Sequence, residues 1–335
     1  MKQVVITGPM ACAVVEKPDP VRAGNFVLID IHAAPMCTEF HQFRDGHNSD
    51  SLGHEAAGVV VEAPIGGRFQ VGDRVVVMPQ NGCGACDLCK AGEHIRCQIP
   101  VDPLVVCGSL TGRATYAEKL IQQEHLLWPV PNDISMKHAS MACCGLGPTF
   151  NACETMNVGA GDTLLVSGLG PVGLGAVVNG VIRGARVIGL ETNPYRISLA
   201  KQLGAEMVLN PMDSTIIDQV KELTNGHGAD KSVEASSADS APLTLLKCTR
   251  IGGQMASVGW GGPVRMSDVV ARGVTLHGCW HWNHVTQSDR MAWAIRQAAP
   301  LLDMLITHEF LIAEVEKAWK LQLTGECGKV ILVPN

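Results

Sequence analysis

The glycine-rich turn at residues 168–173 (Gly-Leu-Gly-Pro-Val-Gly) constrains the fold of this chain more than any other feature. It follows the apolar run Thr163–Ser167, and an acidic residue, Glu191, ends the next apolar run. In a strand–turn–helix unit the first glycine permits the tight turn, the second lets the backbone approach a pyrophosphate, and the third lets helix and strand pack closely. The alternative, a packing turn without a cofactor, is disfavoured by this full context. The pattern predicts a parallel α/β unit that binds a dinucleotide.

The acidic residue also selects the dinucleotide. A carboxylate at Glu191 can accept hydrogen bonds from both ribose hydroxyls and would repel a 2′-phosphate. We therefore expect NAD and not NADP.

The segment Thr163–Ile182 contains no charged residue and is long enough to resemble a transmembrane helix. Its glycines and Pro171 argue against that interpretation, because they divide the segment into a strand, a tight turn and a buried helix.

The pattern of apolar residues changes along the 335 residues of the chain. Short β-branched runs fill roughly the first 145 residues, which predicts a mostly β region. Short apolar runs then alternate with helix-length segments, which predicts a doubly wound parallel sheet. The last segment ends in the apolar run Lys329–Val333, which could rejoin the first sheet. The fold class is therefore α/β, with a mostly β domain at 1–147 and 285–335 and a dinucleotide-binding domain at 148–284.

Charge and cysteine content exclude several classes of protein. The net charge is −6, and no basic run is present, so nucleic acid and anionic membrane are poor partners. The 13 cysteines are odd in number, and the first ten residues do not form a secretory signal. A chain of this kind uses cysteine for metal or catalysis more often than for disulfides, and we expect it in the cytoplasm.

Four cysteines lie close together in the pattern C-x2-C-x2-C-x7-C: Cys83, Cys86, Cys89 and Cys97. The segment has almost no apolar periodicity, so something other than a hydrophobic core must order it. Four thiolates form a closed tetrahedral zinc site without an open position, which predicts a structural metal and not a catalytic one. A nucleic-acid-binding zinc ribbon has similar spacing, but the acidic chain argues against it.

Together with Gly-His-Glu at 53–55, Gly161-Asp162 before the first nucleotide-binding strand and the closing Gly328-Lys329-Val330, these motifs identify a resemblance. The chain resembles the zinc-dependent medium-chain dehydrogenases, the alcohol dehydrogenase superfamily, over essentially its whole length. The resemblance implies a GroES-like mostly β catalytic domain, with a structural-zinc lobe at 83–97, next to a Rossmann domain. It also implies two zinc ions per chain, one catalytic and one structural.

The resemblance carries roles to individual residues. It implies a catalytic zinc held by Cys37, His54 and Cys144, with Glu55 as an acid near the metal. Thr38, Glu39 and His41 resemble the segment that carries the hydroxyl proton relay and the carboxylate that orients the zinc histidine. The cofactor contacts that it implies are Thr149, Gly168, Gly170, Pro171, Val172, Gly173, Glu191 and Arg196.

Three departures from the family leave alternatives open. Thr38 follows Cys37 directly, where relatives usually have one residue between them, and the gap to His54 is short. Cys143 precedes Cys144 and could be the ligand instead.

The resemblance implies an NAD-dependent oxidoreductase that transfers a hydride between an alcohol and the cofactor and gives an aldehyde or ketone. A dehydrogenase of polyols, amino alcohols or a secondary metabolite is the alternative on the same scaffold. A non-catalytic NAD-binding sensor is a third possibility. The expected partners are a small-molecule alcohol or carbonyl and further copies of the chain, as a dimer or tetramer. Trp260 and the segment Trp280–His284 either line the substrate pocket or belong to a core or interface.

Overall fold

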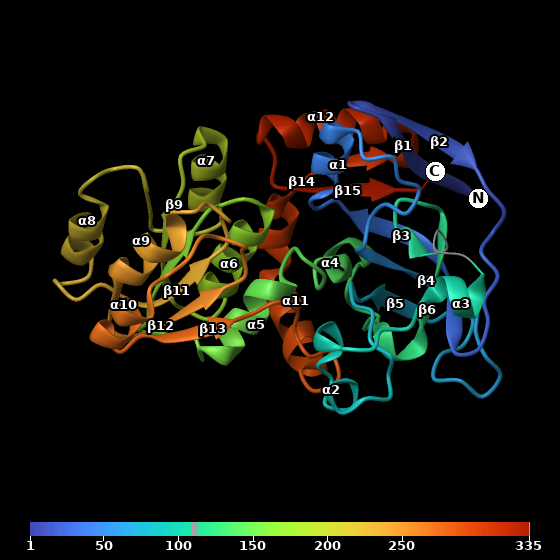
Figure 1. Cartoon of the computed structure of the whole chain (residues 1–335), viewed down its shortest axis with the longest axis horizontal. Helices are drawn as coiled ribbons and strands as arrows, with labels where there is room; N and C mark the ends of the chain where they lie inside the picture. Colours follow the sequence, from blue (N-terminus) through green and yellow to red (C-terminus); the bar gives the residue numbers. More distant parts are fainter. Residues whose placement is uncertain (109–112, 335) are drawn as a thin grey trace.

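The computed structural model describes residues 1–108 and 113–334. Six parallel strands form one of its sheets, in the region predicted to bind a dinucleotide and called here the nucleotide-binding region (Figure 1). The strands are β8 (Thr163–Ser167), β9 (Arg186–Leu190), β10 (Met207–Leu209), β11 (Ala229–Glu234), β12 (Thr249–Ser257) and β13 (Thr275–Gly278). Their spatial order is β10-β9-β8-β11-β12-β13, the doubly wound order with the first strand in the middle.

Helices cover both faces of this sheet. They are α6 (Pro171–Val181), α7 (Pro194–Gln202), α8 (Ile216–Leu223), α9 (Ala241–Cys248) and α10 (Met266–Arg272). The charge-free segment forms β8, the glycine turn and α6, as predicted, and no described helix combines the length and apolar composition that a membrane crossing requires.

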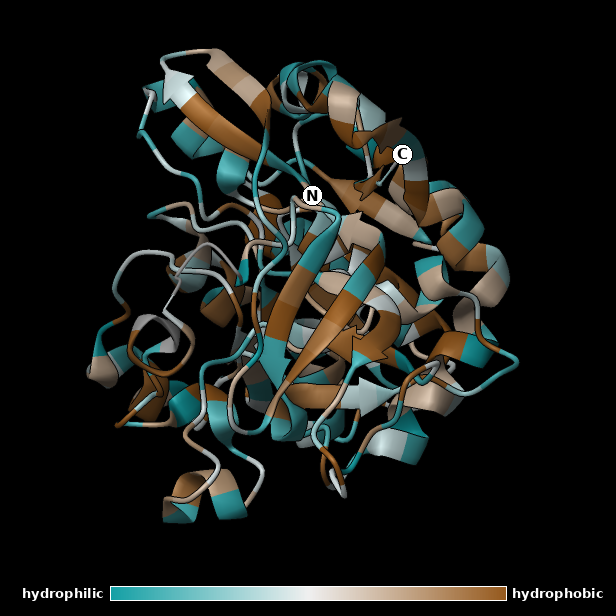
Figure 2. Cartoon of the chain, turned by 90° about the vertical axis from the view of Figure 1, so that its right-hand side faces the viewer, coloured by the Kyte–Doolittle hydropathy of each residue, from teal (hydrophilic) through white to brown (hydrophobic). Residues whose placement is uncertain are grey.

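The second region is a mixed sheet with the strand order β14-β15-β3-β4-β5-β7, with β6 paired to β3 and a separate β1–β2 hairpin. Its strands are β1 (Lys2–Gly8), β2 (Ala11–Glu16), β3 (Phe26–Pro35), β4 (Ala56–Glu62), β5 (Arg74–Val77), β6 (Lys119–Gln123), β7 (Leu127–Pro129), β14 (Ile306–Leu311) and β15 (Lys329–Val333). Figure 2 faces this region, and its strands carry many of the hydrophobic segments. The sequence prediction that Lys329–Val333 rejoins the first sheet is confirmed, because β15 pairs antiparallel with β3.

The remaining helices flank this sheet or join the two regions. They are α1 (Glu39–Asp45), α2 (Asp87–Lys90), α3 (Pro103–Cys107), α4 (Met136–Ser140), α5 (Gly147–Thr155), α11 (Ser288–Leu305) and α12 (Val315–Thr324), with short 3-10 turns η1 (His94–Arg96), η3 (Glu124–Leu126) and η4 (Ile312–Glu314). Helix α11 continues through Pro300, because the buried Leu302 and Leu305 hold its last turns in the core.

One hydrophobic core joins the two regions. It includes Met78 and Trp128 from the mixed-sheet region and Leu164 and Val177 from the nucleotide-binding region. Trp282, on the segment between β13 and α11, packs edge-on against Trp128 at 5.5 Å between ring centroids. This shared core places the ends of β8 and α6 beside the loops of the mixed sheet.

Candidate functional site

Three predicted zinc ligands converge from distant parts of the chain. Cys37 follows β3, His54 precedes β4, and Cys144 lies between α4 and α5. With Glu55 they form a group whose potential ligand atoms all lie within 4.8 Å of one another. Cys144, and not Cys143, joins this group, because the Cys143 thiol points away and donates to the carbonyl of Val77 at 3.3 Å.

The donor set fits a tetrahedral zinc ion. His54 Nε2 lies 3.4 Å from Cys144 Sγ. Ordinary Zn–N and Zn–S bond lengths in a tetrahedron place such atoms about 3.6 Å apart. The pKa of the Cys37 thiol is well below its ordinary value, because hydrogen bonds from Cys144 and His54 outweigh its burial. Thiolate is the form that binds metal.

Glu39 orients the histidine. His54 Nδ1 lies 2.6 Å from Glu39 Oε1, and Glu39 Oε2 accepts from the Tyr116 hydroxyl at 2.8 Å and from the Cys37 backbone N–H at 3.1 Å. Burial opposes ionisation of Glu39, but the hydrogen bond and charge of His54 lower its pKa to about 2. This carboxylate leaves Nε2 of the imidazole for the metal.

A buried ion pair supports Glu55. Lys329, the first residue of β15, donates to Glu55 Oε1 at 2.7 Å, and Glu55 Oε2 accepts from the Cys144 backbone N–H at 3.0 Å. Burial raises the pKa of Glu55 to about 7, and the charge of Cys37 adds to this, while Lys329 opposes it. Glu55 thereby links the strand of Lys329 to the loop that presents Cys144.

The four-cysteine lobe also fits zinc. Its Sγ atoms lie within 4.8 Å of one another, and the pairs Cys83–Cys89 and Cys86–Cys97 are each 3.9 Å apart. Tetrahedral Zn–S geometry gives about 3.8 Å for such an edge. Backbone N–H groups of Ala85 and Cys86 lower the pKa of the Cys83 thiol to about 6.

The glycine turn has the shape that a pyrophosphate needs. A Cβ on Gly173 would lie 1.8 Å from the Gly168 carbonyl oxygen, so this residue permits the close approach of helix and strand. A Cβ on Gly170 would meet nothing nearer than an Arg196 nitrogen at 3.9 Å. Gly170 is also the N-cap of α6, so the space beside it faces free backbone N–H groups that favour an anion.

Glu191 is held at the end of β9 by three backbone N–H groups, of Leu169, Thr192 and Asn193. Together with Gly170 and Arg196 it lines a cavity of about 300 Å³ beside the glycine turn. The cradle of the turn and this cavity fit the adenosine half of a dinucleotide.

A single larger cleft brings the two regions together at the metal group. It measures about 450 Å³, and the residues that line it include Cys37, Thr38, His54, Cys144 and Val172. Val172 belongs to the glycine turn, so the cleft connects the predicted zinc ligands with the predicted cofactor turn.

Two residues that were predicted to contact the cofactor or to carry the proton are not among the described residues that line the cleft. Thr149 is fully buried and bonds inward, donating to the Leu146 carbonyl and accepting from Asn179, and it is not among the described residues that line the cleft. His41 is exposed on α1. Its ring centroid lies 4.1 Å from that of Phe40, with the two rings tilted by 36°, and His41 is not among the described residues that line the cleft.

The tryptophan-rich segment divides between two environments. Trp260, Trp280 and His281 line the cleft. Trp282 and His284 are buried in the protein, and Trp282 donates to the Ala142 carbonyl at 2.7 Å. Both of the interpretations drawn from the sequence therefore hold for part of the segment.

Sequence reasoning missed Tyr116 and the role of Lys329. Tyr116 carries no local signal. Lys329 does carry one, since it is the only charged residue in an otherwise apolar strand.

Comparisons with known proteins give matches to both regions of the chain. Residues 23–132 match the family described as alcohol dehydrogenase GroES-like domain, and residues 171–299 match that described as zinc-binding dehydrogenase. An L-threonine 3-dehydrogenase of Symbiobacterium thermophilum is 30% identical over 96% of this chain and 93% of its own length.

Solved structures have the same fold. The alcohol dehydrogenase TADH from Thermus sp. ATN1 superposes with a TM-score of 0.88 at 24% identity over 100% of both chains. An NAD-dependent alcohol dehydrogenase superposes with a TM-score of 0.81 at 25% identity over 99% of both chains. The family accounts for both cofactors, zinc and NAD, and for the oxidation of an alcohol. The chain belongs to the zinc-dependent medium-chain dehydrogenase superfamily and is an NAD-dependent alcohol oxidoreductase.

Proposed function

We propose that the reaction takes place in the cleft beside Cys37, His54 and Cys144, with NAD bound along the glycine turn. The observation that carries this proposal is the shared cleft, which these three residues line together with Val172 of that turn. A zinc ion held there would act as a Lewis acid on the substrate oxygen, and the nicotinamide would accept the hydride.

The side chains of this chain then orient and move protons. Glu39 fixes the tautomer and direction of His54, and Tyr116 fixes Glu39. Thr38 follows the ligand Cys37 directly, and its hydroxyl is exposed in the cleft. His41 lies at the surface of α1, about one helical turn after Thr38. We assign the substrate proton to the Thr38 hydroxyl in the cleft, and His41, at the surface, would release that proton to water.

Glu191 is proposed to bind the adenosine ribose and to exclude a 2′-phosphate. Three backbone N–H groups donate to its carboxylate, so its orientation in the cavity is fixed.

We also propose that each chain binds two zinc ions and that the protein works in a reducing compartment. Seven cysteines serve the two metal groups or lie beside them as thiols, and all 13 are free of disulfides among the described residues. Thiolate ligands persist where thiols stay reduced, which favours the cytoplasm.

The test is elemental analysis of zinc together with NAD binding on a matched pair of variants. We expect two zinc ions in the wild-type chain, one in Cys144→Ala, and two in Cys143→Ala, whose thiol faces away from the group. His54→Ala should abolish turnover and keep NAD binding. One zinc in the wild-type chain, with no gain on zinc addition, would contradict the catalytic site and leave only the lobe.

We further propose a homo-oligomer built on β13. This strand is an unpaired edge of the nucleotide-binding sheet, and Leu276 on it and Trp260 and Trp280 near it are exposed. Exposed edges and apolar patches of this kind are typical of interfaces between copies.

A further inference from the structure

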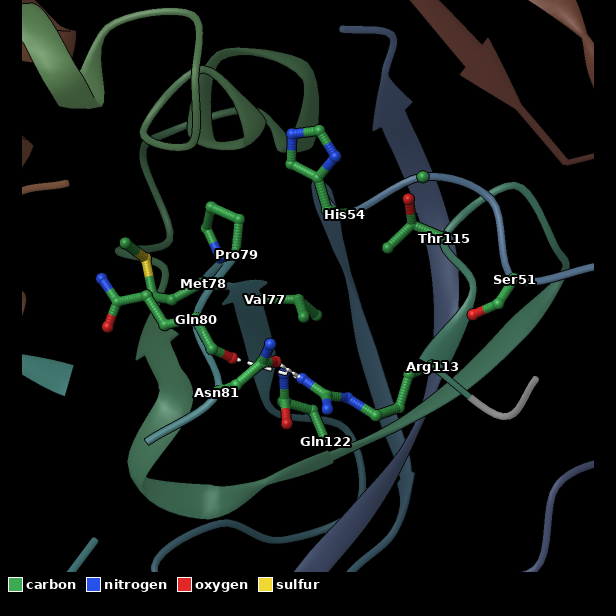
Figure 3. A pocket seen from close by; sticks show the side chains of 11 residues that line it. Ser51, His54, Val77, Met78, Pro79, Gln80, Asn81, Arg113, Thr115 and Gln122 are labelled. Atoms are coloured by element: carbon green, nitrogen blue, oxygen red, sulfur yellow. Dashed lines mark hydrogen bonds between the residues drawn. The ribbon is translucent and has the colours of Figure 1, made fainter. Parts of the chain in front are cut away.

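A second cavity adjoins the catalytic cleft. It measures about 250 Å³, and two residues, His54 and Pro79, line both it and the cleft. Figure 3 shows His54 at one end of this cavity and Arg113, Gln80, Asn81 and Gln122 at the other. A molecule held at the metal group can therefore extend past His54 toward the guanidinium.

The walls of this cavity carry buried polar atoms without partners. Gln80 Oε1, Thr115 Oγ1 and Arg113 Nε each lack a hydrogen-bond partner in the described part of the chain. Gln80 is 2% exposed and Thr115 is 1% exposed. Buried polar atoms in native proteins are nearly always hydrogen-bonded, so three such atoms around one cavity indicate a polar ligand.

The charge of the cavity is positive. Among its described lining residues there is no Asp or Glu, and Arg113 is the one permanently charged side chain. The Arg113 guanidinium donates through Nη2 to the Gln80 carbonyl oxygen at 3.3 Å and to Asn81 Oδ1, as Figure 3 shows. Both of these acceptors are neutral, and they hold the guanidinium in place without neutralising it.

Burial makes this cation costly. It lowers the pKa of Arg113, while the charge of Asp102, which is outside the cavity lining, opposes the shift. A guanidinium remains charged under these conditions, and an anion in the cavity would offset its loss of hydration.

We propose that this cavity is a substrate subsite that binds a carboxylate through Arg113, and that the substrate is therefore an alcohol that also carries a carboxylate. This inference rests on the proposed function, because it needs the carbinol end at the metal group. Guanidinium and carboxylate match as planar groups with paired donors and acceptors. The Thr115 hydroxyl can donate a further neutral hydrogen bond to the carboxylate, whereas Gln80 Oε1 is an acceptor and would pair with a donor group of the substrate.

A phosphate monoester fits the cavity less well. It carries more charge and more acceptor oxygens than a carboxylate, and the cavity offers a single permanent cation among its described residues. The observations therefore favour the carboxylate.

The experiment compares each member of a series of hydroxycarboxylates of increasing chain length with its neutral carboxamide, using the zinc-loaded enzyme and NAD. We expect kcat/KM for the best carboxylate to exceed that for its carboxamide on the order of tenfold to a hundredfold, the range of one charge-assisted hydrogen-bonded pair. In Arg113→Gln the ratio should fall to about one. Arg113→Lys should retain part of it, because the charge remains without the planar fork.

The matched control is Arg265→Gln. Arg265 has the same charge but lies just before α10 in the nucleotide-binding region, with a side chain that is 79% exposed. This variant should keep the wild-type ratio. Thr115→Val provides a second test that leaves the charge in place, and it should lower the ratio by less than Arg113→Gln does. Zinc content and thermal unfolding show whether each variant folds.

A readout without catalysis separates this inference from the proposed function. Glutarate, a dicarboxylate without a carbinol, should bind the wild-type enzyme in calorimetry and should bind Arg113→Gln at least about tenfold more weakly. If neutral alcohols turn over but no carboxylate is preferred at any length, the subsite is refuted and the dehydrogenase stands. A preference for phosphate esters over carboxylates would also overturn it. If nothing turns over, the proposed function fails and the glutarate measurement alone decides the subsite.

Discussion

At the scale of single residues, the pair Lys329–Glu55 shows how the chain keeps charges inside the protein. Both side chains are almost fully buried, at 1% and 0% exposure, and their atoms lie 2.7 Å apart. Burial lowers the pKa of Lys329, but the charge of Glu55 more than restores it, so the net direction is upward. Removing one partner of such a pair leaves an uncompensated buried charge, which costs far more than the pair contributes.

We predict that Lys329→Met destabilises the protein by roughly 3 kcal/mol near neutral pH. The deficit should grow as the pH rises. In the wild-type protein the folded-state pKa of Glu55 is about 7, above the ordinary value of 4.5. Lys329→Met removes the cation that opposes this shift, so the native state of the variant binds more protons than its unfolded state. Stability from protonated Glu55 is present at low pH and is lost as the pH rises through its folded pKa.

Urea unfolding across pH measures this. The control Lys320→Met removes an exposed lysine that pairs with Glu316 on α12. It should change stability by less than about 1 kcal/mol at every pH. A Lys329→Met protein as stable as wild type in alkaline solution would refute the role given to the pair.

At the scale of elements, the strand–turn–helix unit β8–α6 depends on the contact of Gly173 with the Gly168 carbonyl. Alanine is a better helix former than glycine by about 1 kcal/mol, so helix propensity alone would make Gly173→Ala stabilising. The built Cβ, however, would lie 1.8 Å from a backbone oxygen that cannot move aside without displacing the turn.

We predict that Gly173→Ala weakens NAD binding by at least about tenfold, because it displaces the turn that faces the pyrophosphate. Fluorescence titration with NADH measures it. Gly159→Ala is the control, since a Cβ there meets nothing within 4 Å and the residue precedes β8 without touching the turn. Equal NADH affinity in the two variants would show that the close approach is not required.

The zinc lobe is joined to its surroundings by three histidines at the same scale. His94 of the lobe lies 5.2 Å from His125 of η3 and 5.1 Å from His284, measured between ring centroids. His284 donates to the His125 carbonyl oxygen at 2.8 Å. Burial lowers the pKa of His94 and of His284 to about 4, so the folded protein holds both rings neutral.

This cluster predicts acid sensitivity. In the unfolded state His94 and His284 have the ordinary histidine pKa of 6.5, whereas in the folded state they bind protons only near pH 4. Between these two values the unfolded state therefore binds more protons. The stability that the neutral rings give is complete above pH 6.5 and is lost as the pH falls from 6.5 toward 4. His284 alone should contribute a loss on the order of 1 kcal/mol on going from about pH 7.5 to about pH 5.5.

Chemical unfolding at the two pH values, with zinc present, should show a smaller loss for His284→Gln than for wild type. His227→Gln, an exposed histidine on the nucleotide-binding region, should behave as wild type does. An unchanged acid loss in His284→Gln would rule out His284 as a source of the sensitivity.

At the scale of the whole molecule, the nucleotide-binding sheet has two edges of different character. Strand β10 ends one side and β13 the other, and the apolar residues Trp260 and Trp280 lie near β13, in contact with each other at 5.6 Å. The β13 edge is therefore the surface on which a second copy would extend the sheet.

If the proposed oligomer forms through β13, Leu276→Lys on this strand should give a species of smaller mass than the wild-type chain, because a charge on an edge strand opposes pairing. Met207→Lys on β10 is the matched control, since Met207 is exposed to 36% and Leu276 to 38%. Light scattering after size-exclusion chromatography measures the mass. A monomeric wild-type chain, or equal masses in both variants and wild type, would contradict the assignment of this edge.

Features that depend on short spacing along the chain could be predicted from the sequence. The strands Thr163–Ser167 and Lys329–Val333 have the bounds of the apolar runs that predicted them. The four-cysteine lobe and the glycine turn are local in the same way, since all of their functional atoms come from one short segment. The division of the chain at 147 and 284 stays a prediction.

Features that join distant segments could be seen only in the tertiary structure. Lys329 meets Glu55 across 274 residues, and it does so because β15 pairs with β3. The choice between Cys143 and Cys144, the inward position of Thr149 and the position of Arg113 in a cavity beside His54 likewise depend on packing. No local pattern marks them, because the direction of a side chain is set by the register of strands and by the core that both regions share.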